Sequence, residues 1–185
     1  SKLVQENTVV REVLAELNPL LAAHNQVINC HPGENVAYPA ELSYGIRAAN
    51  SCGADIYFSR HANTAYNYYE GAIGAEVCTH STDSLGTEIG NKICSNLARL
   101  GFINRGVKYR DDLSECNSIV NTSMIIELFF LEATKDAELY NKLGPKRVAH
   151  AIANAIDSRI PFEPQTQSSA SNIVQNSNSI EYQGH

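Results

Sequence analysis

The sequence contains no tryptophan, a single methionine and no long apolar run. A helix that crosses a bilayer needs about 20 consecutive apolar residues, and no segment approaches that length. Lysine and arginine together occupy only 14 positions without forming a run, and the formal net charge is −6. A face that binds nucleic acid needs clustered positive charge. These absences argue against a membrane-spanning protein and against nucleic acid as a partner.

Disulfide and zinc-knuckle patterns are also missing. The five cysteines are widely spaced, and none belongs to a Cys-x-x-Cys pair; they are Cys30, Cys52, Cys78, Cys94 and Cys116. An odd number at wide spacing favours buried thiols in a reducing compartment. The opening residues lack the apolar core of a signal peptide. We therefore expect synthesis in the cytoplasm without a signal peptide; the alternative is a leader that has been removed.

What is present is the pattern of one globular domain. The chain has 185 residues, of which 43% are hydrophobic, enough to bury a sizeable core. Apolar spacing and helix-end signals predict helices at residues 9–21, 40–51, 84–100, 135–142 and 145–156. Strands are predicted at 26–30, 55–61, 74–80 and 123–132. This alternation predicts an α/β three-layer sandwich with a mostly parallel central sheet flanked by helices.

The composition changes near the C-terminus. Residues 1–160 carry the predicted folded domain, whereas residues 161–178 are rich in Gln, Ser and Asn and are expected to form a flexible polar tether. Residues 179–185, SIEYQGH, return to a short strand-like pattern that closes on Gly-His.

One carboxylate interrupts the most apolar segment. Glu127 lies in the run Met124–Phe130, which has the composition of a central strand covered on both faces. At the carboxyl end of such a strand, desolvation would raise its pKa toward that of a general base. The alternative is an edge strand, or a strand end, from which Glu127 reaches solvent. His61 ends the strand predicted before it, and taken alone is most simply a hydrogen-bonded surface residue.

Five sequence blocks together resemble a known family. The segments are GADIYFSRHANTA with GAIGAEVCTH, and, in matching order, IRAAN, NRGVKYRDDL and TSMIIELFFLEATKDAELY. They resemble the zinc-dependent N-acetylmuramoyl-L-alanine amidases over about residues 6–156, and most of all the catalytic domain of a phage lysin. The resemblance implies hydrolysis of the amide between N-acetylmuramic acid and L-alanine in peptidoglycan, with zinc as cofactor and the cell wall as the place of action.

The resemblance also implies roles for individual residues. His61 corresponds to a zinc ligand, Glu6 to the ligand glutamate at the start of the first helix, and Glu127 to the catalytic carboxylate. The alternative for Glu6 is a carboxylate at a helix N-terminus that is favoured by the helix dipole. Asn63 is expected to contact substrate. The tyrosine-rich loop after it either contacts the stem peptide or is simply a packed loop.

The family's first ligand is a histidine in a Gly-His pair that ends a first strand, before the ligand glutamate. The matching feature here is SIEYQGH, which makes His185 the candidate ligand and implies a circular permutation, natural or engineered. The tail is then a displaced strand. If it pairs with its own chain the protein is a monomer, and if it is exchanged between two chains the protein is a strand-swapped dimer. The alternative is that the tail begins a linker to a lost wall-binding module and its histidine is accidental.

With zinc held by His185, Glu6 and His61, the resemblance implies a metal-activated water that Glu127 deprotonates for attack on the amide. Two other functions stay open at this point. One is a catalytically dead wall-binding domain with an incomplete metal site. The other is a zinc peptidase or carboxypeptidase that acts on wall peptides.

Overall fold

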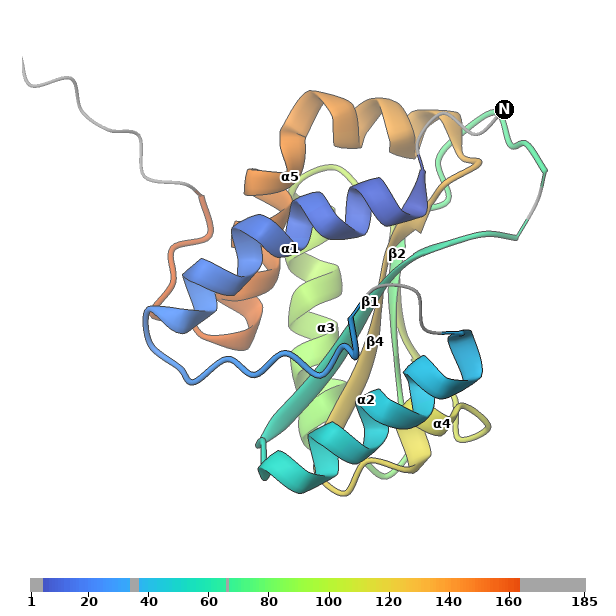
Figure 1. Ribbon diagram of the computed structural model, residues 1–185. Helices are drawn as coiled ribbons and strands as arrows, with labels where there is room; N and C mark the ends of the chain where they lie inside the picture. The colour runs from blue at the N-terminus through green and yellow to red at the C-terminus, as the bar shows by residue number, and fades with distance from the viewer. Residues whose placement is uncertain (1–4, 34–36, 66, 164–185) are drawn as a thin grey trace, which may run out of the picture.

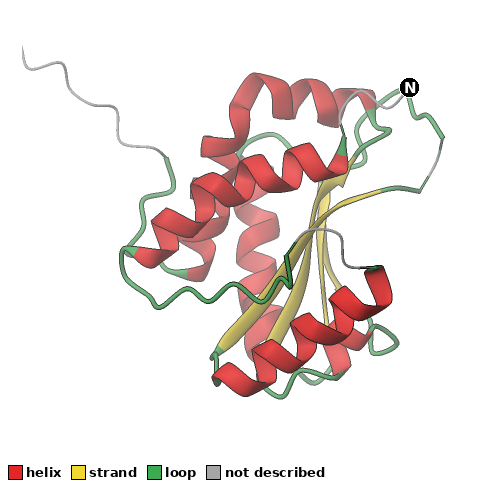
Figure 2. Cartoon of the chain, in the orientation of Figure 1, coloured by secondary structure: helices red, strands yellow, loops and turns green. Residues whose placement is uncertain are grey.

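The computed structural model describes residues 5–33, 37–65 and 67–163. Its elements, in chain order, are α1 (Glu6–Ala22), α2 (Tyr38–Cys52), β1 (Ile56–Asn63), β2 (Ala75–Thr79), α3 (Ser84–Arg99), β3 (Asn104–Tyr109), α4 (Ser114–Asn117), β4 (Thr122–Phe130) and α5 (Thr134–Ile156). Figure 2 shows the strands gathered between helices on either side. The predicted strand at 179–185 and nearly all of the predicted tether lie outside the described residues.

The four strands form one sheet in the order β1-β4-β2-β3. β1 pairs in parallel with β4, and β2 in parallel with β3, whereas β2 and β4 are antiparallel. Helices α1, α3 and α5 cover one face of the sheet, and α2 and α4 lie on the other (Figure 1). The predicted α/β sandwich with a mostly parallel sheet is confirmed, with β4 in a central position.

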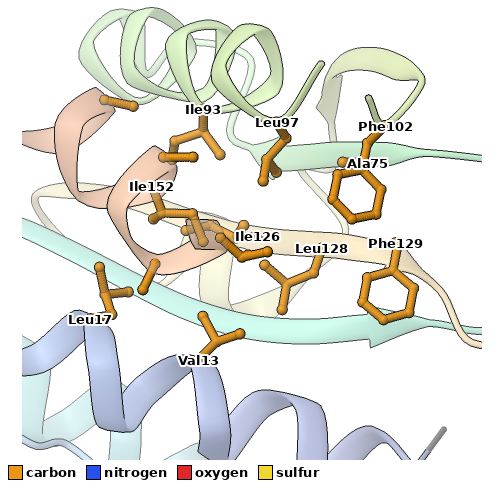
Figure 3. Close-up of a cluster of buried hydrophobic side chains, with 14 of the residues drawn as sticks. Val13, Leu17, Ala75, Ile93, Leu97, Phe102, Ile126, Leu128, Phe129 and Ile152 are labelled. Atoms are coloured by element: carbon orange, nitrogen blue, oxygen red, sulfur yellow. The ribbon is translucent and has the colours of Figure 1, made fainter. Parts of the chain in front are cut away.

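The main core lies between the sheet and helices α1, α3 and α5. Leu17, Ile93, Ile126 and Ile152 are fully buried there, each from a different element (Figure 3). Completely burying side chains of this kind stabilises the fold by roughly 1.5–3 kcal/mol each. This core carries most of the hydrophobic stabilisation.

The opposite face of the sheet has a much smaller apolar cluster. It contains Cys78, Cys116 and Ile125, with Leu113 packed against it. Successive side chains of a strand point to opposite faces, so Ile126 enters the main core while Ile125 and Glu127 point to the α2 and α4 side. A polar site can therefore form on this face without disturbing the main core.

One predicted strand is wrong. Residues 26–30 are irregular, and Val27 and Ile28 are exposed. A strand needs a neighbour to bond its backbone, and among the described residues β1 pairs with β4 alone, so nothing pairs with the 26–30 segment. The alternative that placed Glu127 on an edge strand is also wrong, since β4 is flanked by β1 and β2.

Other differences are smaller. The two helices predicted at 135–142 and 145–156 are one element, α5, which kinks at Gly144 with φ of 74°. Strand β3 and the short helix α4 were not predicted. All five cysteines are free; Cys78, Cys94 and Cys116 are buried, but Cys52 is exposed. Within the part of the chain that the structure describes, no helix is both long and apolar enough to cross a membrane.

Candidate functional site

Three functional side chains lie side by side across adjacent strands. His61 of β1 is in register with Glu127 of β4, and Glu127 is in register with Glu76 of β2. Residues in register on neighbouring strands point to the same face. The row His61–Glu127–Glu76 therefore lies on the α2 and α4 side of the sheet. Sequence reasoning had singled out the first two, and the fold makes them neighbours.

Glu6, which belongs to a helix and not to the sheet, lies next to the His61 end of this row. It is the first residue of α1, and its Oε1 atom lies 3.5 Å from Nδ1 of His61. The same oxygen accepts a long hydrogen bond of 3.5 Å from the backbone N–H of Ala62. Both side chains are partly exposed. The structure thus brings the predicted carboxylate and imidazole ligands together from segments more than fifty residues apart.

Glu127 has the properties of a proton acceptor. Burial raises the pKa of its carboxyl from the ordinary 4.5 to about 7; His61 opposes the rise, while Glu76 and Glu6 add to it. Its Oε2 atom is buried and has no hydrogen-bond partner among the described residues. A carboxyl whose pKa lies near neutrality can take up and release a proton at physiological pH. An unpaired buried oxygen also leaves room for a further partner such as a water molecule or a metal ion.

Hydrogen bonds offset the burial of the Glu76 carboxylate, whereas Glu127 has no such bonds to its buried oxygen among the described residues. Glu76 is only 8% exposed, and its Oε2 atom accepts a hydrogen bond of 2.8 Å from Nε of Arg105 on β3. Its Oε1 atom accepts a bond of 3.2 Å from the amide of Asn63. The guanidinium of Arg105 also lies over the ring of Phe130, 5.0 Å from its centroid. Asn63, predicted to contact substrate, is therefore held by a carboxylate of the site.

Sequence reasoning missed Glu76 and Arg105. The signal for Glu76 resembles that for Glu127, because it is the charged residue in a strand whose five residues are all buried. Arg105 gave no such signal. It lies in an edge strand with a mixed polar pattern, and only the folded sheet brings it to Glu76.

The chemistry of Glu6 and His61 fits a zinc ion, which carboxylate oxygen and imidazole nitrogen commonly bind. Among residues 5–33, 37–65 and 67–163, no three His, Cys, Asp or Glu side chains are grouped to hold a metal. The third predicted ligand, His185, lies outside the described residues. The described residues therefore include two of the predicted ligands, one fewer than the three protein ligands usual for a catalytic zinc.

Known proteins share the sequence pattern and the fold of this chain. The family model for N-acetylmuramoyl-L-alanine amidase matches residues 1–158. The chain belongs to this amidase family. The match spans every described element of the sheet and the whole His61–Glu127–Glu76 row.

Two solved structures share the fold of this chain. The catalytic domain of the CD27L endolysin, which targets Clostridia difficile, is 28% identical, with a TM-score of 0.72 over 84% of this chain and 85% of that one. The catalytic domain of the amidase CwlV from Bacillus (Paenibacillus) polymyxa var. colistinus is 20% identical, with a TM-score of 0.69 over 83% and 84% of the two chains. At 20% identity, the likeness to CwlV shows a shared fold alone.

Two curated relatives, both from Clostridium perfringens, are longer proteins. An uncharacterized protein of strain 13 / Type A is 30% identical over 157 residues, which are 84% of this chain and 45% of the relative. An uncharacterized 38.4 kDa protein is 24% identical over 179 residues, or 96% of this chain and 52% of the relative. The chain spans about half the length of the curated relatives it matches.

The raised pKa of Glu127 predicts a pH-dependent stability. The folded state binds the proton of this carboxyl more tightly than the unfolded chain does, so Glu127 destabilises the fold increasingly as pH rises from about 4.5 to 7. We expect Glu127→Gln to raise the melting temperature of metal-free amidase at pH 8 and to lose that advantage toward pH 5. Differential scanning calorimetry in a chelator measures this. A gain that does not vary with pH, or an equal gain from the exposed Glu88→Gln control, contradicts the prediction.

The Glu76–Arg105 pair predicts non-additive stability. Arg105→Ala removes the cation beside this buried carboxylate and leaves only the amide of Asn63 as a donor, so we expect a loss of roughly 1–3 kcal/mol in the free energy of unfolding. Glu76→Gln should recover part of that loss when added to Arg105→Ala, because the unpaired charge is gone. Urea unfolding of the four proteins of this cycle measures the coupling. Arg110→Ala, whose partner Asp112 is exposed, is the matched control. Strictly additive losses would exclude the coupling.

Proposed function

We propose that this chain is a zinc-dependent amidase that cleaves the bond between the lactyl group of N-acetylmuramic acid and L-alanine in peptidoglycan, and so weakens the cell wall. The observation that carries the proposal is the meeting of Glu6, His61 and Glu127 at one end of the sheet, in a chain of the amidase family. A carboxylate with a pKa near 7 beside two potential zinc ligands supports hydrolysis of an unreactive amide near neutral pH.

Glu6 and His61 would hold the zinc, with a third ligand from elsewhere. When bound, such an ion supplies a Lewis acid for the amide carbonyl and lowers the pKa of a coordinated water. The remaining chemistry belongs to the protein. Glu127 accepts a proton from the water that attacks the amide carbon and returns it to the leaving nitrogen, which departs as the amino group of L-alanine. Asn63, fixed by Glu76, contributes an amide group beside the reacting atoms for substrate binding.

We further propose that residues 179–185 are a displaced strand whose last residue, His185, is the third ligand. Among the described residues, the outer edge of β1 has no paired strand. A strand added parallel to β1 would end at the same end of the sheet as His61. The polar residues 164–178 would link it to the folded part. This arrangement is a circular permutation within one chain, or an exchanged strand between two.

The reaction products test the proposed function. Zinc-loaded protein incubated with purified peptidoglycan should release new amino groups on L-alanine, identified by dinitrophenylation and mass spectrometry. Glu127→Gln should reduce the rate by at least about 100-fold, because a general base is lost, and yet still bind zinc. The exposed Glu88→Gln variant should match the unaltered protein. New amino termini within the stem peptide would indicate a peptidase instead, and wall binding without any release would indicate a non-catalytic domain.

Metal content tests the role of His185. We expect about one zinc per chain after dialysis, and a loss of most of that zinc in His185→Ala, because two protein ligands hold zinc much more weakly than three. His24→Ala, which alters a histidine at the far end of α1, should leave the zinc content unchanged. Inductively coupled plasma mass spectrometry gives the ratio. Full zinc and full activity in a chain shortened by residues 164–185 would refute the displaced-strand proposal.

A further inference from the structure

A second cluster of reactive side chains lies outside the proposed zinc site, between helix α2 and the segment that follows α1. Figure 1 shows this segment running from α1 toward α2. The carbonyl oxygen of Cys30 faces Gly45 in the middle of α2, and a Cβ atom added to Gly45 would lie 3.5 Å from it. The same added atom would lie 3.6 Å from the hydroxyl of Tyr57 on β1. The absence of a side chain at Gly45 therefore allows Cys30 to approach the helix closely.

The close approach brings two thiols together. The side chain of Cys30 interacts with that of Cys52 through a hydrogen bond. Cys52 is the last residue of α2, and its Sγ atom donates to the carbonyl of Ala49 at 3.3 Å. This bond turns the sulfur back along the helix, toward the turn that Cys30 contacts. Gly45, Ala49 and Cys52 follow the spacing i, i+4, i+7 and so lie on one face of α2. Thiols 22 positions apart in the sequence are thus neighbours.

These two cysteines differ from the other three in their access to solvent. Cys52 is exposed and Cys30 is partly buried, whereas Cys78, Cys94 and Cys116 are buried. Burial raises the pKa of the Cys30 thiol, and the nearby Cys52 sulfur adds to the rise. Cys30 therefore ionises less readily than an ordinary thiol. A reagent in solution meets Cys52 first and reaches Cys30 through it.

The segment around Cys30 has the freedom that bond formation requires. A disulfide holds its two sulfurs closer than a hydrogen bond does, so one of the two backbones has to move. Residues 26–30 are irregular, and within the described ranges they belong to no strand of the sheet. Their movement toward the end of α2 breaks no strand pairing. The main core is also left intact, because Val27 and Ile28 are exposed.

We propose that Cys30 and Cys52 form a modification site, at which a small disulfide compound such as oxidised glutathione produces an intramolecular disulfide. The Cys52 thiolate attacks one sulfur of the compound, and the other sulfur leaves as a thiolate and takes up the proton that Cys52 lost. The Cys30 thiolate then attacks Sγ of Cys52 and expels the second half of the compound, which takes up the proton from Cys30. Two protein thiols are oxidised, and one disulfide compound is reduced to two thiols.

The bond has a consequence for stability. It closes a loop of 22 positions that contains α2, and cross-linking a loop of this length stabilises a fold by restricting the unfolded chain. Thiol pairs stay reduced in the cytoplasm and form persistent disulfides outside it. The bridged form is therefore the more stable form outside the cytoplasm. Neither Cys30 nor Cys52 belongs to the proposed zinc site, so the inference does not depend on the proposed amidase function.

Peptide mapping tests whether the bridge forms. Trypsin cuts after Arg47, so Cys30 and Cys52 leave in separate peptides, 12–47 and 48–60, each with a single cysteine. The full chain is incubated with excess oxidised glutathione, denatured in iodoacetamide and digested without reductant. We expect mass spectrometry to find the two peptides linked, lighter by two hydrogen atoms than their sum, and to find them separate after treatment with dithiothreitol. The three buried cysteines should be alkylated as free thiols.

The melting temperature and two single variants test the consequence and the order of attack. The oxidised protein should melt about 5–10 °C above its reduced form, the scale expected for a loop of this length. Cys52→Ser should show neither the linked peptides nor the rise. Cys30→Ser should retain glutathione on Cys52 as a mixed disulfide, because no second thiol expels it. The reduced form of each variant is its own control.

Three outcomes overturn the proposal. They are the absence of linked peptides in the unaltered protein, a bridge between Cys78 and Cys116 in their place, and a Cys30–Cys52 bridge that leaves the melting temperature unchanged. Each can occur whether or not the chain releases L-alanine amino groups from peptidoglycan, so failure of this inference and failure of the proposed function are seen separately.

Discussion

The structure depends on placing two carboxylates and an imidazole side by side on a partly buried sheet face. Glu127 and Glu76 are directly opposed on antiparallel strands, and like charges so close repel strongly where water is scarce. The fold offsets this repulsion at one of the two carboxylates only. Arg105 and Asn63 donate hydrogen bonds to both oxygens of Glu76, which offsets the cost of burying this carboxylate. Glu127 receives no such compensation from the described residues, and the pKa of its carboxyl rises to about 7.

The rest of the fold supplies the stability that offsets this unfavourable arrangement of charges. The alternation of β4 sends Ile126 and Leu128 into the large core under α1, α3 and α5, while Glu127 points to the other face. Stability thus comes mainly from one side of the sheet, and the proposed site lies on the other. α1 takes part in both, because Val13 and Leu17 pack into the core while Glu6, at its first turn, reaches His61. Because the buried side chains fix this helix, they also fix the position of a proposed metal ligand.

Local patterns in the sequence predicted much of this and failed at identifiable points. Helical spacing and the apolar run around Glu127 are properties of contiguous residues, so α1, α3, β4 and Glu127 itself could be predicted. The hydrogen bond between Arg105 and Glu76 joins residues of two different strands, and no pattern among neighbouring residues predicts it. The segment at 26–30 has strand-like composition but no partner strand, and pairing is a property of the whole sheet. The antiparallel β2–β4 pairing likewise cannot be deduced from the alternation of strands and helices.

The β4–α5 junction connects the strand of the proposed proton acceptor with the β1–β2 loop. Glu127 lies near the end of β4, and the residues that follow, Glu132, Thr134 and Asp136, bind the backbone of the β1–β2 loop. One continuous segment therefore sets the position of both the proposed proton acceptor and this loop. The ends of this loop cannot move relative to β4 without breaking hydrogen bonds to the buried side chains of Glu132 and Asp136.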